Sequence, residues 1–154
     1  MPLGSVFPLW CYRSHFGSWT ATLLCVTTES RKTLLVVDDD PIILRFVARI
    51  LEEQNYEVLV ANSGVDAMRI AAGHAGDIAL LLSDFEMPGM SGIDLAVKLT
   101  ELRPQIKVLR MSGYTGGMLV LNEGWHFLAK PFIESQLRAL ITTLLFPANS
   151  RFKS

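Results

Sequence analysis

The chain has 154 residues, the length of one domain on the usual prior of about 100 to 200 residues per domain, which argues against two independent catalytic domains. Half of the residues are apolar and 19% are charged, so the sequence can bury a core and is not a disordered chain. A formal net charge of −1 provides no general attraction for nucleic acid, and no stretch reaches the roughly 18 apolar residues of a membrane span. We expect a soluble, cytoplasmic protein that binds neither nucleic acid nor membrane.

Apolar runs and helical patterns alternate from Arg31 onward. The segment 33–37 (TLLVV) is a continuous apolar run, which is typical of a parallel strand covered on both faces. Asp40 and Pro41 suit the cap and first position of a helix whose apolar residues recur at helical spacing until Asn55.

The strand and helix unit then repeats along the chain. The pattern predicts further strands at 56–61, 78–83, 106–112 and 125–129, and further helices at 63–72, 93–102, 115–122 and 137–145. Strands that alternate with helices in this way imply right-handed crossovers, and therefore a parallel sheet with helices on both faces.

Polar side chains stand where the predicted strands end. Asp38 and Asp39 follow the first strand, Asp84 the third and Lys130 the fifth, while Ser112 ends the fourth. Ligands of doubly wound sheets bind beyond the carboxyl ends of the strands, so we expect these five side chains to form one site.

Three carboxylates in one site require positive charge, because each pair at about 4 Å repels by about 4 kcal/mol at an effective dielectric near 20. Lys130 supplies one charge, and Mg²⁺, with Mn²⁺ as the alternative ion, supplies the rest. The three histidines show no spacing typical of zinc ligands. Phosphoryl transfer onto a carboxylate suits this set, and Asp84 is the best nucleophile because it stands alone on its strand.

Four segments carry a family resemblance: LLVVDDDP at 34–41, LSDFEMPGMSG at 82–92, MSGY at 111–114 and FLAKPF at 127–132. With these segments, the chain from about Arg31 to Phe146 resembles the receiver domain of two-component response regulators. The resemblance implies a CheY-like, flavodoxin-like α/β fold, in which a doubly wound parallel sheet of five strands in the order 2-1-3-4-5 forms the middle of three layers.

The resemblance also implies roles for single residues and for partners. The metal ligands would be Asp38, Asp39, the phosphoacceptor Asp84 and the backbone carbonyl of Glu86. The phosphate would be bound or sensed by Ser112, Lys130 and the switch aromatic Phe127. The peptide bond before Pro131 would be cis. A sensor histidine kinase or a histidine phosphotransfer protein would donate the phosphoryl group, and an unknown downstream protein would be the target. Such a domain is not an enzyme in the usual sense, since it catalyses only its own phosphorylation and dephosphorylation.

Three features limit the resemblance. Only 17 residues separate Ser112 from Lys130, about one helical turn fewer than expected, so the helix at 115–122 should be short. Arg110 interrupts an apolar strand, and the explanation that the sequence offers is snorkelling at the edge of the packing. The segment 111–116 most resembles receivers attached to hybrid sensor kinases.

Residues 1–30 differ in composition from the rest of the chain. They hold two charged side chains, both cysteines and five of the 14 aromatic residues, and they lack the features of a signal peptide. We expect a disordered or loosely packed extension, or a start codon placed upstream of the true one. Residues 31–146 are predicted as the receiver and 147–154 as a tail too short for an output domain. Output should therefore pass through a partner, whether the chain is a stand-alone regulator, a phosphorelay intermediate or a piece of a longer protein.

Two other functions compete with a phosphoacceptor. A receiver-like interaction module that is never phosphorylated is disfavoured because all five site residues are present. A haloacid-dehalogenase-like phosphatase also begins with a strand and an Asp-x-Asp motif, here Asp38 and Asp40. It would need a further acidic pair after the lysine, and only Glu134 follows Lys130.

Overall fold

Five strands and four helices are formed by residues 31–113 and 124–147, the part of the chain that the computed structural model describes. In chain order they are β1 (Thr33–Val37), α1 (Pro41–Glu53), β2 (Glu57–Ala61), α2 (Gly64–Gly73), β3 (Ile78–Asp84), α3 (Gly92–Leu102), β4 (Lys107–Ser112), β5 (Trp125–Ala129) and α4 (Glu134–Leu145). The predicted extension at 1–30, the predicted helix at 115–122 and residues 148–154 of the predicted tail lie outside the described residues.

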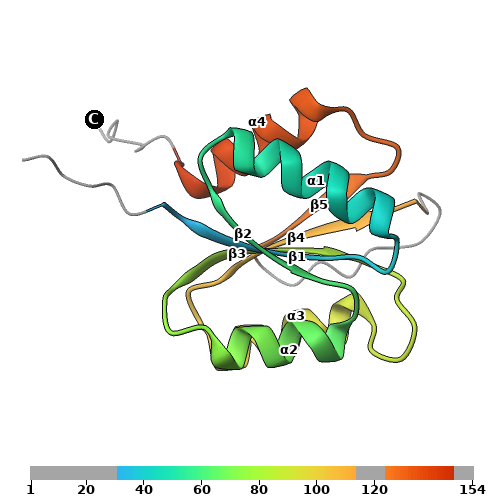
Figure 1. Cartoon of the computed structure of the whole chain (residues 1–154), viewed down its shortest axis with the longest axis vertical. Helices are drawn as coiled ribbons and strands as arrows, with labels where there is room; N and C mark the ends of the chain where they lie inside the picture. The colour runs from blue at the N-terminus through green and yellow to red at the C-terminus, as the bar shows by residue number, and fades with distance from the viewer. Residues whose placement is uncertain (1–30, 114–123, 148–154) are drawn as a thin grey trace, which may run out of the picture.

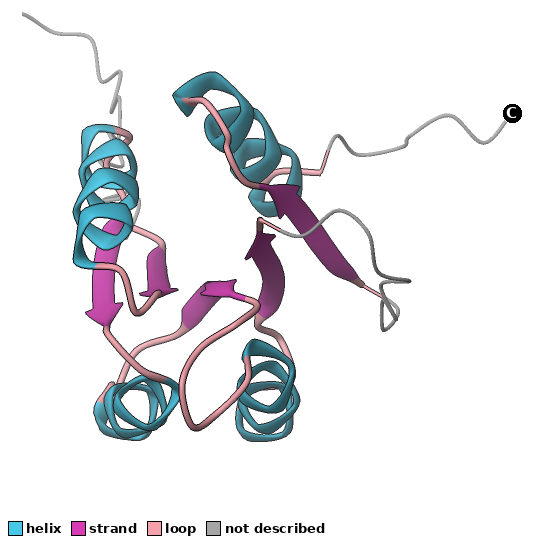
Figure 2. Ribbon diagram, turned by 90° about the vertical axis from the view of Figure 1, so that its right-hand side faces the viewer, coloured by secondary structure: helices cyan, strands magenta, loops and turns pink. Residues whose placement is uncertain are grey.

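The strands form one parallel sheet in the order β2-β1-β3-β4-β5, which confirms the predicted topology. Helices α1 and α4 cover one face of the sheet, and α2 and α3 cover the other (Figure 1). A view turned by 90° shows the same three layers (Figure 2). Because β1 and β3 are neighbours, with Val37 paired to Ser83, their carboxyl ends lie side by side.

The sheet is buried on both faces, which explains why β1 is apolar without alternation. Leu34 and Val36 belong to the core beneath α1 and α4, whereas Leu35 and Val37 belong to the core beneath α2 and α3. All four are fully buried, and burial of each such side chain contributes about 1.5–3 kcal/mol. This packing holds β1 in place and thereby fixes the position of the acidic residues that follow it.

Polar caps start three of the helices. The side-chain oxygens of Asp40, Ser63 and Ser91 accept hydrogen bonds from the backbone N–H groups of Ile42, Asp66 and Asp94 at 2.8, 3.2 and 3.1 Å. The predicted cap at Asp40 is therefore confirmed, and it turns the chain into α1 immediately after the acidic pair.

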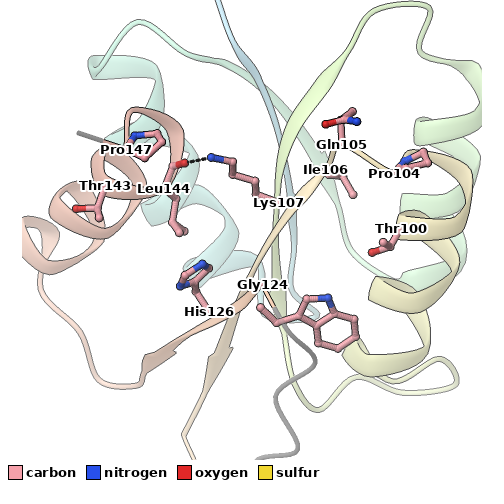
Figure 3. Close-up of a pocket in the computed structure, with 11 residues that line it drawn as sticks. Thr100, Pro104, Gln105, Ile106, Lys107, Gly124, His126, Thr143, Leu144 and Pro147 are labelled. Carbon is pink, nitrogen blue, oxygen red and sulfur yellow. Dashed lines mark hydrogen bonds between the residues drawn. The ribbon is translucent and has the colours of Figure 1, made fainter. Parts of the chain in front are cut away.

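The amino ends of β4 and β5 lie away from the acidic residues. There, a hollow is lined by residues of α3, β4, β5 and α4, and the Lys107 ammonium donates a hydrogen bond to the Leu144 carbonyl in the last turn of α4 (Figure 3). A cation in that position complements the helix dipole and links α4 to the sheet. Within the part of the chain that the structure describes, no helix is both long and apolar enough to cross a membrane.

Candidate functional site

Three carboxylates converge at the carboxyl ends of the two central strands. Asp38 and Asp39 follow β1, and Asp84 is the last residue of β3. One carboxylate oxygen from each residue lies within 4.8 Å of the others. Asp38 is 1% exposed and Asp84 8%, whereas Asp39 faces solvent. The convergence predicted from the strand ends is confirmed, and the site is buried on one side and open on the other.

Lys130 completes this group from the end of β5. Its Nζ lies 2.8 Å from Asp38 Oδ2 and 2.9 Å from Asp84 Oδ1. Its backbone N–H donates to the Ser112 carbonyl at 2.7 Å, which ties the lysine to the end of β4, and its bond to Pro131 is cis. One ammonium group therefore joins carboxylates from two different strands.

Burial and charge act against each other in this pocket. Burial raises the pKa of the Asp38 carboxyl, although hydrogen bonds from Lys130 and from the Asp40 N–H oppose the shift. For Lys130, burial alone would lower the pKa, but its hydrogen bonds to Asp38 and Asp84 and the charges of those carboxylates raise it overall. The lysine therefore stays protonated, and Asp38 holds a proton more readily than an ordinary carboxylate does.

The remaining predicted residues surround the acidic group in different ways. A hollow beside it is lined by Asp84, Glu86, Ser112, Gly113 and Lys130. Ser112 is buried and Glu86 is exposed, so a serine hydroxyl and the loop after β3 both border the space next to Asp84. Phe127 is half-buried on β5, outside the lining of this hollow. Its switch role, like the metal-binding role of the Glu86 carbonyl, stays a prediction.

Gly92 is a site residue that appears among the sequence motifs only as the last residue of the segment 82–92. A Cβ atom at this position would lie 2.1 Å from the Asp84 carbonyl oxygen. Its N–H donates to the Phe85 carbonyl at 3.2 Å. The absence of a side chain thus lets α3 begin directly against the backbone of Asp84.

Arg110 corrects the expectation of a snorkelling side chain. It is 1% exposed, and its Cζ lies 4.7 Å from the ring centroid of Phe85 and 5.7 Å from that of Trp125. β4 lies between β3 and β5, and aromatic rings at the end of β3 and the start of β5 cover the guanidinium. The side chain therefore has no path to solvent along which it could snorkel.

Comparison with known proteins assigns the family. A family model described as the response regulator receiver domain matches residues 34–142. The chain belongs to this family. The receiver is 32% identical over 117 residues to Sensor kinase CckA of Brucella abortus, which covers 73% of this chain and 12% of that protein. The chain thus spans a small part of that curated relative.

Solved structures of receivers share the fold. A CheY-like response regulator receiver domain protein from Methanospirillum hungatei is 32% identical, with a TM-score of 0.69 over 75% of this chain and 94% of that chain. The response regulator protein TrrA from Thermotoga maritima, in complex with Mg²⁺-BeF, is 28% identical, with a TM-score of 0.66 over 74% of this chain and 99% of that one. The flavodoxin-like, CheY-like fold class predicted from the sequence is thereby confirmed.

Proposed function

We propose that this receiver accepts a phosphoryl group on Asp84 from a histidine-phosphorylated partner, with a bound divalent cation, and passes the signal on by protein contacts. The observation that supports this most is the placement of one ammonium group 2.9 Å from Asp84 Oδ1, in a pocket that two further carboxylates border. In this proposal the domain acts only on its own phosphoryl group, both when it gains the group and when the group is hydrolysed.

The residues present fit a divalent ion of the Mg²⁺ type. Three carboxylates and one ammonium group sum to a formal charge of −2, which one divalent cation balances. All the donors are hard carboxylate oxygens, and the exposed side of Asp39 leaves room for water or phosphate oxygens as further ligands. Asp38, Asp39 and Asp84 would hold the ion, which when bound would neutralise the phosphoryl oxygens as well.

Apart from the divalent cation, the transfer needs only groups that the site and the donor provide. A carboxylate oxygen of Asp84 forms the new bond to phosphorus as the phosphorus–nitrogen bond of the donor breaks, and the imidazole leaves with that bond's electron pair. Lys130 and the Ser112 hydroxyl border the space in which the phosphoryl charge would lie, so both can donate hydrogen bonds to it.

An apolar surface beside the pocket supports a protein donor. Ile42, Phe46 and Ile133 are 75%, 44% and 63% exposed. A second hollow, lined by Ile43, Phe46, Gly113, Lys130, Pro131 and Phe132, joins this surface to the pocket. A donor imidazole must come within bonding distance of Asp84, so its protein must cover the rim. Large exposed apolar side chains are suited to such a contact.

Labelling with acetyl phosphate tests the proposal without a partner. We expect the wild type to take up phosphate in the presence of Mg²⁺, and Asp84→Asn to take up none. Asp77→Asn, which changes an exposed loop aspartate, is the matched control and should label normally. Absence of uptake by the wild type would favour a receiver-like module that is never phosphorylated, and undiminished uptake by Asp84→Asn would mean that the nucleophile is another residue.

A substitution in the apolar surface tests whether the phosphoryl donor docks there. Phe46→Asp should slow transfer from a purified phosphorylated histidine kinase by at least tenfold and leave labelling by acetyl phosphate unchanged. Equal rates of kinase transfer for Phe46→Asp and the wild type would remove this surface from the proposal.

A further inference from the structure

Arg110 is a buried arginine whose guanidinium lies over the ring of Phe85, the residue that follows Asp84. Arg110 stands two residues before Ser112 on β4, paired in register with Ser83 of β3 and Phe127 of β5. It is 1% exposed, and its Nε and Nη1 atoms have no hydrogen-bond partner among the described residues. Burial lowers the pKa of this guanidinium.

Stability does not account for a cation at this position. Val108, Leu109 and Met111, its neighbours on β4, are all buried apolar residues. Among the described residues this charge has no ionic partner. A desolvated charge in that position is costly, and cation–π contacts return only part of the cost. An apolar side chain of similar length would fill the same space without that penalty. We therefore look for the role of Arg110 in the groups that its charge contacts.

The guanidinium contacts one residue beside the phosphoacceptor and one at the amino end of β5. Phe85 directly follows Asp84, and its N–H donates to the Met111 carbonyl at 2.8 Å. Trp125 is the first residue of β5, the strand that leads to Lys130. The charge lies over both rings, 4.7 Å from the Phe85 centroid and 5.7 Å from the Trp125 centroid. A movement of either ring therefore changes the environment of the same buried charge.

Phosphorylation would change the balance between these two contacts. An acyl phosphate on Asp84 carries more negative charge than the free carboxylate, and a buried cation feels this change with little screening by water. The arginine also has N–H donors that form no hydrogen bond in the described residues. Added negative charge at the end of β3 would thus favour the contact at Phe85 over the contact at Trp125.

We propose that Arg110 is a positioning residue that couples the phosphorylation of Asp84 to the position of β5 through its stack on Phe85 and Trp125. This inference rests on the proposed function. Coupling between two sites is reciprocal. A residue through which phosphorylation of Asp84 changes the position of β5 therefore also affects how tightly the pocket binds a phosphoryl analogue.

The emission of Trp125 provides a direct measurement of the coupling. Trp10→Phe and Trp19→Phe leave Trp125 as the only tryptophan, since the chain contains three. In this background we expect beryllofluoride with Mg²⁺ to change the emission of Trp125. Arg110→Met, which keeps the length of the side chain and removes its charge, should reduce that change at least threefold and weaken beryllofluoride binding. Arg110→Lys, which restores the charge without the planar stack, should regain part of the response.

Stability and a matched variant separate coupling from a merely structural role. Arg110→Met should unfold at the same temperature as the background protein or at a higher one, because it removes a buried charge. Arg69→Met, at a side chain that is 76% exposed on α2, should leave the response unchanged.

Three outcomes would overturn the inference. The first is an undiminished emission change in Arg110→Met. The second is a loss of the emission response in Arg110→Met together with a lower unfolding temperature than that of the background protein. Phosphate uptake from acetyl phosphate and Mg²⁺, measured by intact mass on the same variants in a separate incubation without beryllofluoride, identifies the third. If the background protein takes up no phosphate, the proposed function fails and the inference fails with it. If it takes up phosphate and Arg110→Met responds normally, the inference alone fails.

Discussion

Lys130 forms ion pairs with two carboxylates that share a pocket largely shielded from solvent. Replacement by methionine removes the charge and keeps most of the side chain. At 2.8 and 2.9 Å, each ion pair corresponds to about 6 kcal/mol at an effective dielectric of about 20, before the cost of desolvation. Loss of one partner from a buried pair costs about 3–5 kcal/mol, because the other charge remains uncompensated. Since Lys130 is 18% exposed, we expect the lower figure, a loss of about 3 kcal/mol in the free energy of unfolding of the metal-free protein.

Magnesium should recover part of this loss, since it would bind the same carboxylates and balance the same charge. Urea unfolding in excess EDTA and in excess MgCl₂ measures the difference between Lys130→Met and the wild type under both conditions. Lys98→Met changes an exposed lysine on α3 and serves as the matched control. Equal stability of Lys130→Met and the wild type in EDTA would refute the electrostatic reasoning. A loss that is the same with and without Mg²⁺ would refute binding of the ion to these carboxylates.

Three further predictions address the backbone, the packing and the protonation of the site. Gly92→Ala places a Cβ atom against the Asp84 carbonyl and should cost about 1–3 kcal/mol and slow acetyl phosphate labelling, whereas Gly73→Ala, which meets nothing within 4 Å, should do neither. Arg103 donates three hydrogen bonds to carbonyls at and beyond the end of α2, at 2.6, 2.7 and 2.8 Å, so Arg103→Ala should lower the free energy of unfolding by about 1.5–3 kcal/mol in urea titrations without changing labelling. Because the pKa of Asp38 is raised above 3.8, protons should compete with Mg²⁺ at a higher pH than they would at an ordinary aspartate. Titrations by calorimetry should show that the Mg²⁺ affinity is halved at a pH well above 3.8, and an affinity that is halved only near pH 3.8 would contradict the shift.

The local patterns of the sequence were sufficient to predict a parallel α/β sheet and the convergence of the acidic residues, whereas the strand order was implied by the family resemblance. The apolar run from Leu34 to Val37 indicates a strand buried on both faces, and that burial is observed. Asp38 and Asp84 follow such runs, and in a parallel sheet the carboxyl ends of neighbouring strands must meet at one edge. The start of α1 was also predictable, since a capping aspartate followed by proline is a local signal.

Other features depend on contacts between distant segments, which a single sequence does not record. The distance from Gly92 to the Asp84 carbonyl depends on how the loop after β3 returns to the sheet. The environment of Arg110 depends on rings 25 residues before it and 15 residues after it in the chain, at Phe85 and Trp125. For a lone arginine in an apolar strand the sequence suggested snorkelling, and the structure shows a buried stack.

Chemical trapping of the phosphorylated residue tests the central claim most directly. Borohydride reduces an acyl phosphate to an alcohol and thereby converts a phosphorylated aspartate to homoserine. After incubation with acetyl phosphate and Mg²⁺ and reduction with borohydride, peptide mass spectrometry should locate homoserine at position 84. The conversion should be absent when EDTA replaces Mg²⁺. Homoserine at another aspartate, or at none although phosphate has been taken up, would contradict the assignment of Asp84 as the phosphoacceptor.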